Sequence, residues 1–90
     1  PSTKFSDVFD NAFPGKTLLA VLKLRGGGLN ALGRHTVAAL LNAASGGVSF
    51  DLSAGEVIDA FNDAFPGSAS SYESLKNMFD RLNNQGCPLN

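Results

Sequence analysis

Apolar residues recur at helical spacing near the start of the chain. They stand at i, i+3, i+4 and i+7, which places them on one face of a helix. Ser6 is a candidate N-cap, and Pro14-Gly15 is a typical helix stop. We therefore predict a short helix here. Its apolar face carries Phe5, Val8, Phe9, Ala12 and Phe13.

Two further helices are predicted before the middle of the chain. The first begins at Thr17, carries a dense apolar segment and ends before Gly26-Gly27-Gly28, although its apolar residues would also fit a strand. The second has Asn30 as its cap and runs through Ala44, before Gly46-Gly47. Because its apolar residues cover more than one face, we expect this Ala-rich helix in the centre of the fold.

Capping signals place two helices in the second half of the chain. Residues 53–56 form a capping box, and the helix that they open ends at Pro66-Gly67. Residues 70–73 repeat the capping pattern, so we predict a last helix from there to the polar run at 83–86. Ahead of the first capping box, the alternation of residues 48–52 predicts a short extended link.

One short pattern occurs twice. Residues 7–15 and 59–67 share Asp, Phe, Ala, Phe, Pro and Gly in register. In each copy two Phe residues four positions apart face the same side of a helix, and Pro-Gly turns the chain into the following helix. We interpret the pattern as two similar helix corners rather than as a repeated binding motif.

Together these patterns predict an all-α fold. It is a small bundle of four or five helices around a central Ala-rich helix, with two similar Phe-Pro-Gly helix corners. The chain has 90 residues, which is the size of one domain, so we assign residues 1–90 to a single helical domain. A hydrophobic fraction of 43% excludes a disordered chain.

Charge is sparse and balanced. Charged residues make up 17% of the chain, against about 25% in a typical soluble domain, and the formal net charge is -1. No segment clusters Lys or Arg, so we expect no nucleic acid partner. No run of about 18 apolar residues is present, so we expect no membrane span. Neutral surface costs little to desolvate and favours protein contacts, although a buried Ala-rich helix explains the same composition.

The first residue and the cysteine bear on localisation. The chain begins at Pro1 rather than Met, from which we expect a processed, secreted chain. Cys87 is the single cysteine, so it has no intramolecular disulfide partner. In an exported protein, one leftover cysteine indicates either an intermolecular disulfide or a buried thiol.

Three segments carry a resemblance. Gly26-Gly27-Gly28, the stretch 30–44 that contains Arg34-His35, and Gly86-Cys87-Pro88-Leu89 together resemble a small helical module of exported, often multidomain bacterial proteins. The resemblance spans about residues 26–89, and its most specific parts are the Arg34-His35 helix and the Gly-Cys-Pro-Leu end. It implies export and a non-catalytic role, and it brings no catalytic residues to this chain.

Candidate catalytic and metal-binding groups are few. His35 is the only histidine, so a catalytic triad or dyad needs it, with Cys87 as the thiol. No Gly-x-Ser-x-Gly elbow accompanies them, and we expect Arg34 and His35 to cap or bridge neighbouring helices instead. One His and one Cys do not make a structural zinc site, and the acidic residues lack the calcium-loop pattern. We therefore expect no enzyme activity, no metal and no cofactor.

The leading hypothesis is a non-enzymatic structural protein, an exported subunit that self-assembles into an extracellular fibre or layer through neutral helix surfaces. Cys87 is its candidate intermolecular disulfide. One alternative is a module that docks a larger exported protein or a peptide in a helix-lined groove. A second alternative is a small enzyme or ligand carrier that uses His35. The candidate interface or helix-bridging residues are Gly33, Arg34, His35, Val37, Leu41 and Ala44.

Overall fold

The computed structural model describes residues 3–45 and 51–84, which form one 3-10 turn and four α-helices. The extended link predicted at 48–52 and the helix stop at Gly46-Gly47 lie largely or wholly outside these residues, as does Cys87. Within the described ranges there is no strand, so the predicted all-α bundle is confirmed. In chain order the elements are η1 (Phe5–Asp7), α1 (Leu18–Leu22), α2 (Gly28–Ala44), α3 (Ala54–Ala64) and α4 (Ala69–Asn84).

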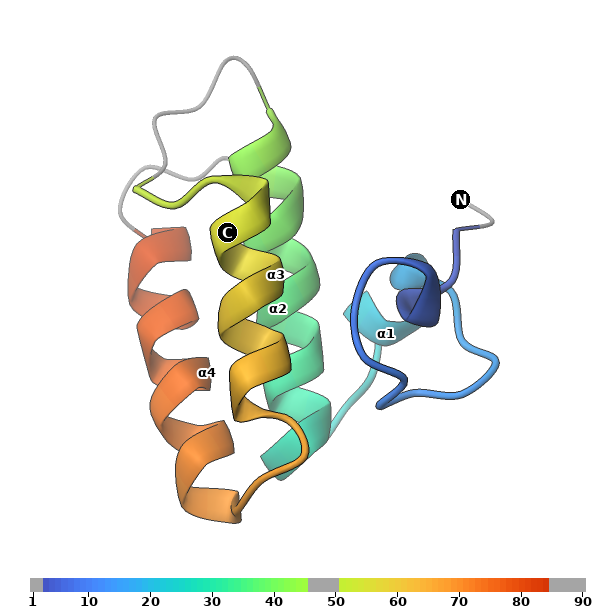
Figure 1. The fold of residues 1–90 in the computed structure, drawn as a ribbon. Coiled ribbons are helices and arrows are strands. Elements are labelled where there is room, and N and C mark those ends of the chain that lie inside the picture. The colour runs from blue at the N-terminus through green and yellow to red at the C-terminus, as the bar shows by residue number, and fades with distance from the viewer. Residues whose placement is uncertain (1–2, 46–50, 85–90) are drawn as a thin grey trace.

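Helix α2 is the centre of the fold, as predicted. It packs against α1, α3 and α4. Figure 1 shows α2, α3 and α4 side by side, with α3 antiparallel to the other two, while η1 and α1 lie to one side of this three-helix unit. Buried residues on more than one face of α2 make these contacts. They are Ala31, Leu32, Gly33, Thr36, Val37, Ala39 and Asn42.

Two of the predicted helix starts are confirmed by their capping hydrogen bonds. The Thr17 hydroxyl accepts a hydrogen bond from the Ala20 N–H at 3.1 Å, which caps α1. At α3 the Ser53 hydroxyl accepts from the Glu56 N–H at 3.1 Å, and the Glu56 carboxylate accepts from the Ser53 N–H at 2.8 Å. This reciprocal pair is the predicted capping box.

The predicted caps of the two longest helices are wrong by two or three residues. α2 begins at Gly28 with Gly27 as its cap, and the Asn30 amide donates instead to the Arg25 carbonyl at 3.1 Å. Gly26 and Gly28 adopt positive φ, a conformation that glycine reaches without steric cost. The chain therefore turns from α1 into α2 within this glycine run, before Asn30.

α4 likewise starts before the predicted 70–73 cap. The Ser68 hydroxyl accepts from the Ser71 N–H, and the Ser71 hydroxyl accepts from the Ser68 N–H, both at 3.1 Å. Ser71 therefore takes the place that Glu has in the standard capping box. The carboxylate of Glu73 instead lies 3.6 Å from the Lys76 ammonium.

The first copy of the repeated pattern does not form the predicted helix, because only the 3-10 turn η1 is helical there. A helix of this length is marginal by itself, and aromatic packing decides its conformation. The ring of Phe5 stacks on Phe9 at 4.6 Å and meets Phe13 edge-on at 4.9 Å. Phe9 in turn packs at 5.4 Å from Phe61, its equivalent in the second copy. Thus the two copies of the pattern contact each other, while only the second ends an α-helix as predicted.

At Gly33 the backbone of α2 packs closely against the Phe13 ring of the N-terminal segment. A Cβ atom at Gly33 would lie 2.5 Å from the Phe13 ring and 3.0 Å from a methyl group of Val21. The absence of a side chain therefore lets the Phe13 ring rest on the α2 backbone. Two backbone hydrogen bonds, from the Phe5 N–H to the Lys16 carbonyl and from the Leu18 N–H to the Thr3 carbonyl, tie the same segment to α1.

Replacing Gly33 with alanine should destabilise the fold. We expect Gly33→Ala to lower the free energy of unfolding by about 1–3 kcal/mol, since overpacking forces the Phe13 ring to move. Urea denaturation followed by circular dichroism measures this. Gly55→Ala is the matched control. Gly55 is also helical but is exposed, and a Cβ atom there would make only an ordinary contact, 3.9 Å from the Ser53 hydroxyl, so alanine should stabilise by up to about 1 kcal/mol. Stabilisation by both variants would contradict the Phe13 contact.

Candidate protein-binding surface

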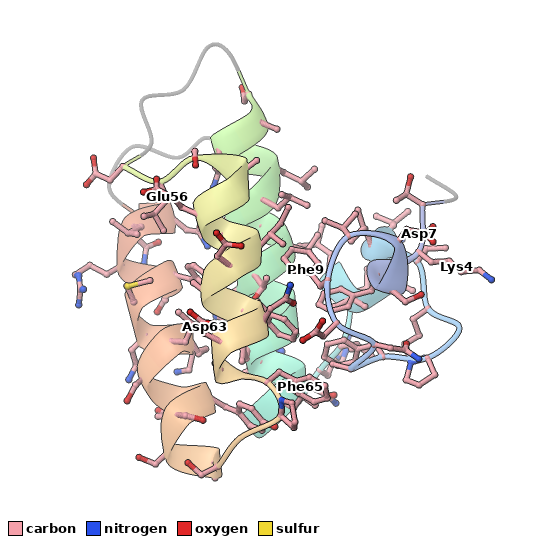
Figure 2. All side chains as sticks on the ribbon, in the orientation of Figure 1. Lys4, Asp7, Phe9, Glu56, Asp63 and Phe65 are labelled. Carbon is pink, nitrogen blue, oxygen red and sulfur yellow. The ribbon has the colours of Figure 1, made fainter. Side chains whose placement is uncertain are left out.

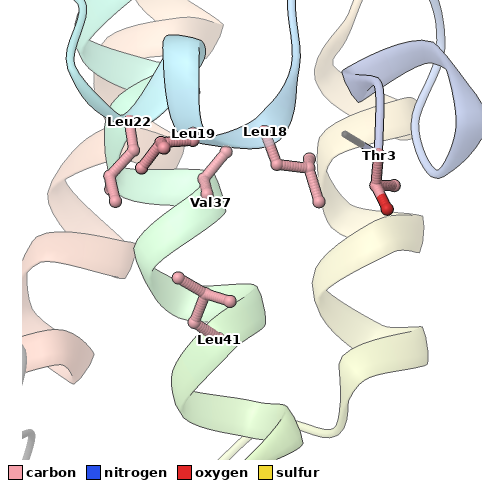
Figure 3. Close-up of a pocket in the computed structure, with 6 residues that line it drawn as sticks. All are labelled: Thr3, Leu18, Leu19, Leu22, Val37 and Leu41. Atoms are coloured by element: carbon pink, nitrogen blue, oxygen red, sulfur yellow. The ribbon is translucent and has the colours of Figure 1, made fainter. Parts of the chain in front are cut away.

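An apolar groove lies between α1 and α2 (Figure 3), and we call it the α1/α2 groove. It encloses about 270 Å³. Its lining residue Val37 is buried, whereas Leu19 and Leu41 are 46% and 42% exposed. These two leucines are the large hydrophobic side chains that the described structure leaves exposed. The lining consists of Thr3, Leu18, Leu19, Leu22, Val37 and Leu41.

The composition of α1 explains why the groove exists. All five residues of α1 are apolar, so the helix presents apolar side chains to solvent as well as to the core. Val21 is fully buried. Leu19 lies two positions earlier and therefore about 160° away around the helix, facing outward. Leu18 and Leu22 are one turn apart and line the groove together.

The chemistry of the α1/α2 groove fits apolar side chains better than a polar substrate. Its lining contains no titratable group, and Thr3 supplies its polar side chain. Its volume of about 270 Å³ is below the range of about 300–1,000 Å³ that is usual for small-molecule pockets. Grooves beside a helix typically accept apolar side chains of another protein segment at helical spacing.

A second depression lies between α3 and α4, on helices that take no part in the α1/α2 groove; we call it the α3/α4 depression. It is shallow and covers about 400 Å³. Its apolar lining residues are half-buried. The lining also contains one carboxylate, that of the exposed Asp63. The lining consists of Ala60, Asp63, Ala64, Ser71, Ser74, Leu75 and Met78.

Arg34 holds the corner between α1 and α2. One guanidinium nitrogen donates to the Leu24 carbonyl at 3.0 Å and to the Gly26 carbonyl at 3.1 Å. These carbonyls follow the end of α1, where backbone acceptors have no helical partner. Arg34 therefore links α2 to the segment after α1.

His35 faces α4 rather than the groove. Its Nδ1 atom lies 3.8 Å from an Asp80 carboxylate oxygen, and its backbone carbonyl accepts from the Asn83 amide at 3.3 Å. Asn83 also accepts from the Asn42 amide at 2.9 Å, within the buried contact of α2 and α4. His35 and Val37 point about 160° apart around α2, so the histidine lies away from the groove.

Burial lowers the pKa of His35 below its ordinary value of 6.5. The Asp80 carboxylate opposes this shift, and the positive charges of Arg34 and Lys76 add to it. Desolvation exceeds the attraction of Asp80, because Asp80 is itself exposed to water and its charge is screened. The folded protein therefore favours the neutral imidazole.

The remaining candidate residues from the sequence are separated in the structure. Val37 and Leu41 lie in the α1/α2 groove, whereas Gly33 is covered by the Phe13 ring inside the chain. Ala44 is exposed at the end of α2. The sequence reasoning missed the groove residues Leu18, Leu19 and Leu22. Their signal is the uninterrupted apolar run of α1, which a short surface helix has no room to bury.

Within residues 3–45 and 51–84, no three His, Cys, Asp or Glu side chains come together as a metal site. Among the same residues, none of the helices has the length and apolar character to cross a bilayer. Comparison of the chain with known protein families, with curated proteins and with solved structures returned no match.

The lowered pKa of His35 predicts a loss of stability in mild acid. The unfolded chain takes up the proton near pH 6.5, whereas the folded chain does so only at lower pH. His35 therefore makes its whole contribution to the free energy of unfolding above this pH. The contribution is lost as the pH falls towards the pKa of His35 in the folded chain. Urea denaturation at about pH 7.5 and about pH 5.5 should show a larger loss for the wild type than for His35→Gln. Equal losses would contradict the assignment.

Proposed function

We propose that this chain is a non-enzymatic structural subunit that associates with other copies of itself through its helix surfaces. The observation that supports the proposal is the α1/α2 groove, where Leu19 and Leu41 are nearly half exposed. Exposed apolar side chains gathered in one place are typical of protein contact sites, while scattered ones are not. The neutral lining of the groove also fits the low charge of the chain.

The energy available from the groove fits a weak, repeated contact. Complete burial of a leucine side chain contributes about 1.5–3 kcal/mol. Covering the exposed parts of Leu19 and Leu41 therefore adds about 1 kcal/mol for each residue. One such contact is weak alone, so a subunit gains only where it engages several neighbours at once, as in a layer or a laterally packed fibre. This arrangement suits a fibre or layer better than an isolated dimer.

The proposal includes an exported location, as the resemblance of the sequence implies. In that setting Cys87 is available as a covalent link between subunits that other contacts have brought together. The chemistry of the groove favours self-association over the alternative of an enzyme or ligand carrier, because His35 lies away from the groove and pairs with Asp80.

Polar substitution in the groove should weaken self-association. We expect the wild type to form species that grow with concentration in light scattering, and filaments or sheets in electron microscopy. Leu41→Gln should weaken each contact by about fivefold, because about 1 kcal/mol of apolar burial is lost. Since Leu41 is exposed, the helix content in circular dichroism should not change.

The control moves the leucine instead of removing it. Leu41→Gln combined with Asn11→Leu keeps the number of leucines, but it places one on an exposed position outside the groove. If the groove carries the contact, the double variant remains as weak as Leu41→Gln. Recovery of association would indicate general hydrophobic adhesion, and a wild type that stays monomeric at every concentration would overturn the proposed function.

A further inference from the structure

The two halves of the chain differ in net charge, and each half builds one of the two hollows. Residues 1–45 carry five basic and two acidic side chains, a net charge of +3, and residues 46–90 carry two basic and six acidic ones, a net charge of -4. The first set of residues builds α1 and α2, and therefore the α1/α2 groove. The second set builds α3 and α4, with the α3/α4 depression. The half of the chain that builds the α1/α2 groove is thus net basic, and the half that builds the α3/α4 depression is net acidic.

On the basic side, a charged side chain directly follows the exposed apolar surface of α1, because Lys23 is the C-cap of that helix. Lys23 follows Leu19 by four positions, which places both on the same side of the helix. Lys23 is exposed, as is Lys16 just ahead of α1. Lys23 therefore places a cation directly after Leu22, which lines the α1/α2 groove.

On the acidic side, the α3/α4 depression has the opposite pattern. Its floor is apolar, with Ala60, Leu75 and Met78 half-buried, and Asp63 stands in its lining. Asp63 is on α3 (Figure 2). Asp59 precedes Asp63 by one turn and is also exposed, so the carboxylates form a row along α3. This surface offers a hollow for a projecting leucine and a carboxylate for a neighbouring cation.

The charges that would meet are not neutralised inside the subunit. The ion pairs among the described residues are His35–Asp80 and Glu73–Lys76. Neither Lys23 nor Asp63 takes part in them. Both charges are therefore accessible to a second copy, and each matches the sign that the other surface requires.

We propose that the α1/α2 groove of one copy binds the α3/α4 depression of the next, with Leu19 entering the depression and Lys23 pairing with Asp63. This inference rests on the proposed function, because it names the surface that the groove contacts during self-association. A contact between two different surfaces continues from copy to copy, and so it builds a filament or a ring. A two-fold contact of groove with groove would instead bring the Lys23 residues of both copies towards each other, which charge repulsion disfavours.

Charge reversal on each surface tests the pairing. Sedimentation velocity at low ionic strength would compare the full-length wild type with Lys23→Asp and Asp63→Lys. Each single variant presents two surfaces of like charge, so its self-association should weaken by roughly fivefold. An equimolar mixture of the two variants should associate again, because each then offers the other a complementary surface in both directions. The double variant Lys23→Asp/Asp63→Lys should associate by itself.

Lys4→Asp and Asp51→Lys are the matched controls, since both residues are exposed and neither lines a depression. They should associate as the wild type does. If the wild type remains monomeric, the proposed function fails, and this inference fails with it. If the wild type associates but both single variants do so equally well, or if the mixture and the double variant fail to recover, self-association stands and the head-to-tail pairing is overturned.

Discussion

The aromatic cluster between the N-terminal segment and the bundle is the interaction on which the rest of the structure depends. Phe5 is fully buried and contacts Phe9, Phe13 and Phe61, so rings from both copies of the repeated pattern share one centre. Each such ring pair contributes about 0.5–1.5 kcal/mol beyond the area that it buries. A helix of five residues such as α1 is not stable in isolation. It persists because this cluster and the Gly33 contact hold the N-terminal segment against α2, and the α1/α2 groove exists only while α1 stays there.

The sequence was informative where local chemistry decides the structure. The Thr17 cap, the Ser53–Glu56 capping box and the stop at Pro66-Gly67 each act within one helical turn, and each appears close to its predicted place. The central position of α2 followed from its apolar residues on several faces. The errors lie where distant contacts override local preference. The predicted helix through Phe13 has good spacing, but packing against Phe61 and Gly33, which are far away in sequence, selects an irregular segment instead.

The candidate site was predictable only in part for the same reason. Val37 and Leu41 were identified on α2, but the leucines of α1 were not among the candidates, since a helical pattern alone does not show how many sides of a short helix are covered. Arg34 and His35 were expected to bridge helices. Arg34 binds the carbonyls after α1, and His35 faces Asp80 on α4. These two polar residues thus position the helices, whereas the contact with other copies is proposed for the apolar surface of α1.

The central claim is that two different surfaces of neighbouring copies contact each other. Intermolecular paramagnetic relaxation enhancement tests this contact most directly. One chain carries Cys87→Ser and a spin label on Ser45→Cys, and it contains no ¹⁵N. Ser45 is the C-cap of α2, four residues after the groove residue Leu41. This chain is mixed with a ¹⁵N-labelled Cys87→Ser chain. The account predicts line broadening of the amides around Asp63 and Leu75 in the ¹⁵N-labelled copy. Broadening confined to α1 and α2, or no broadening at a concentration where the wild type associates, would contradict it.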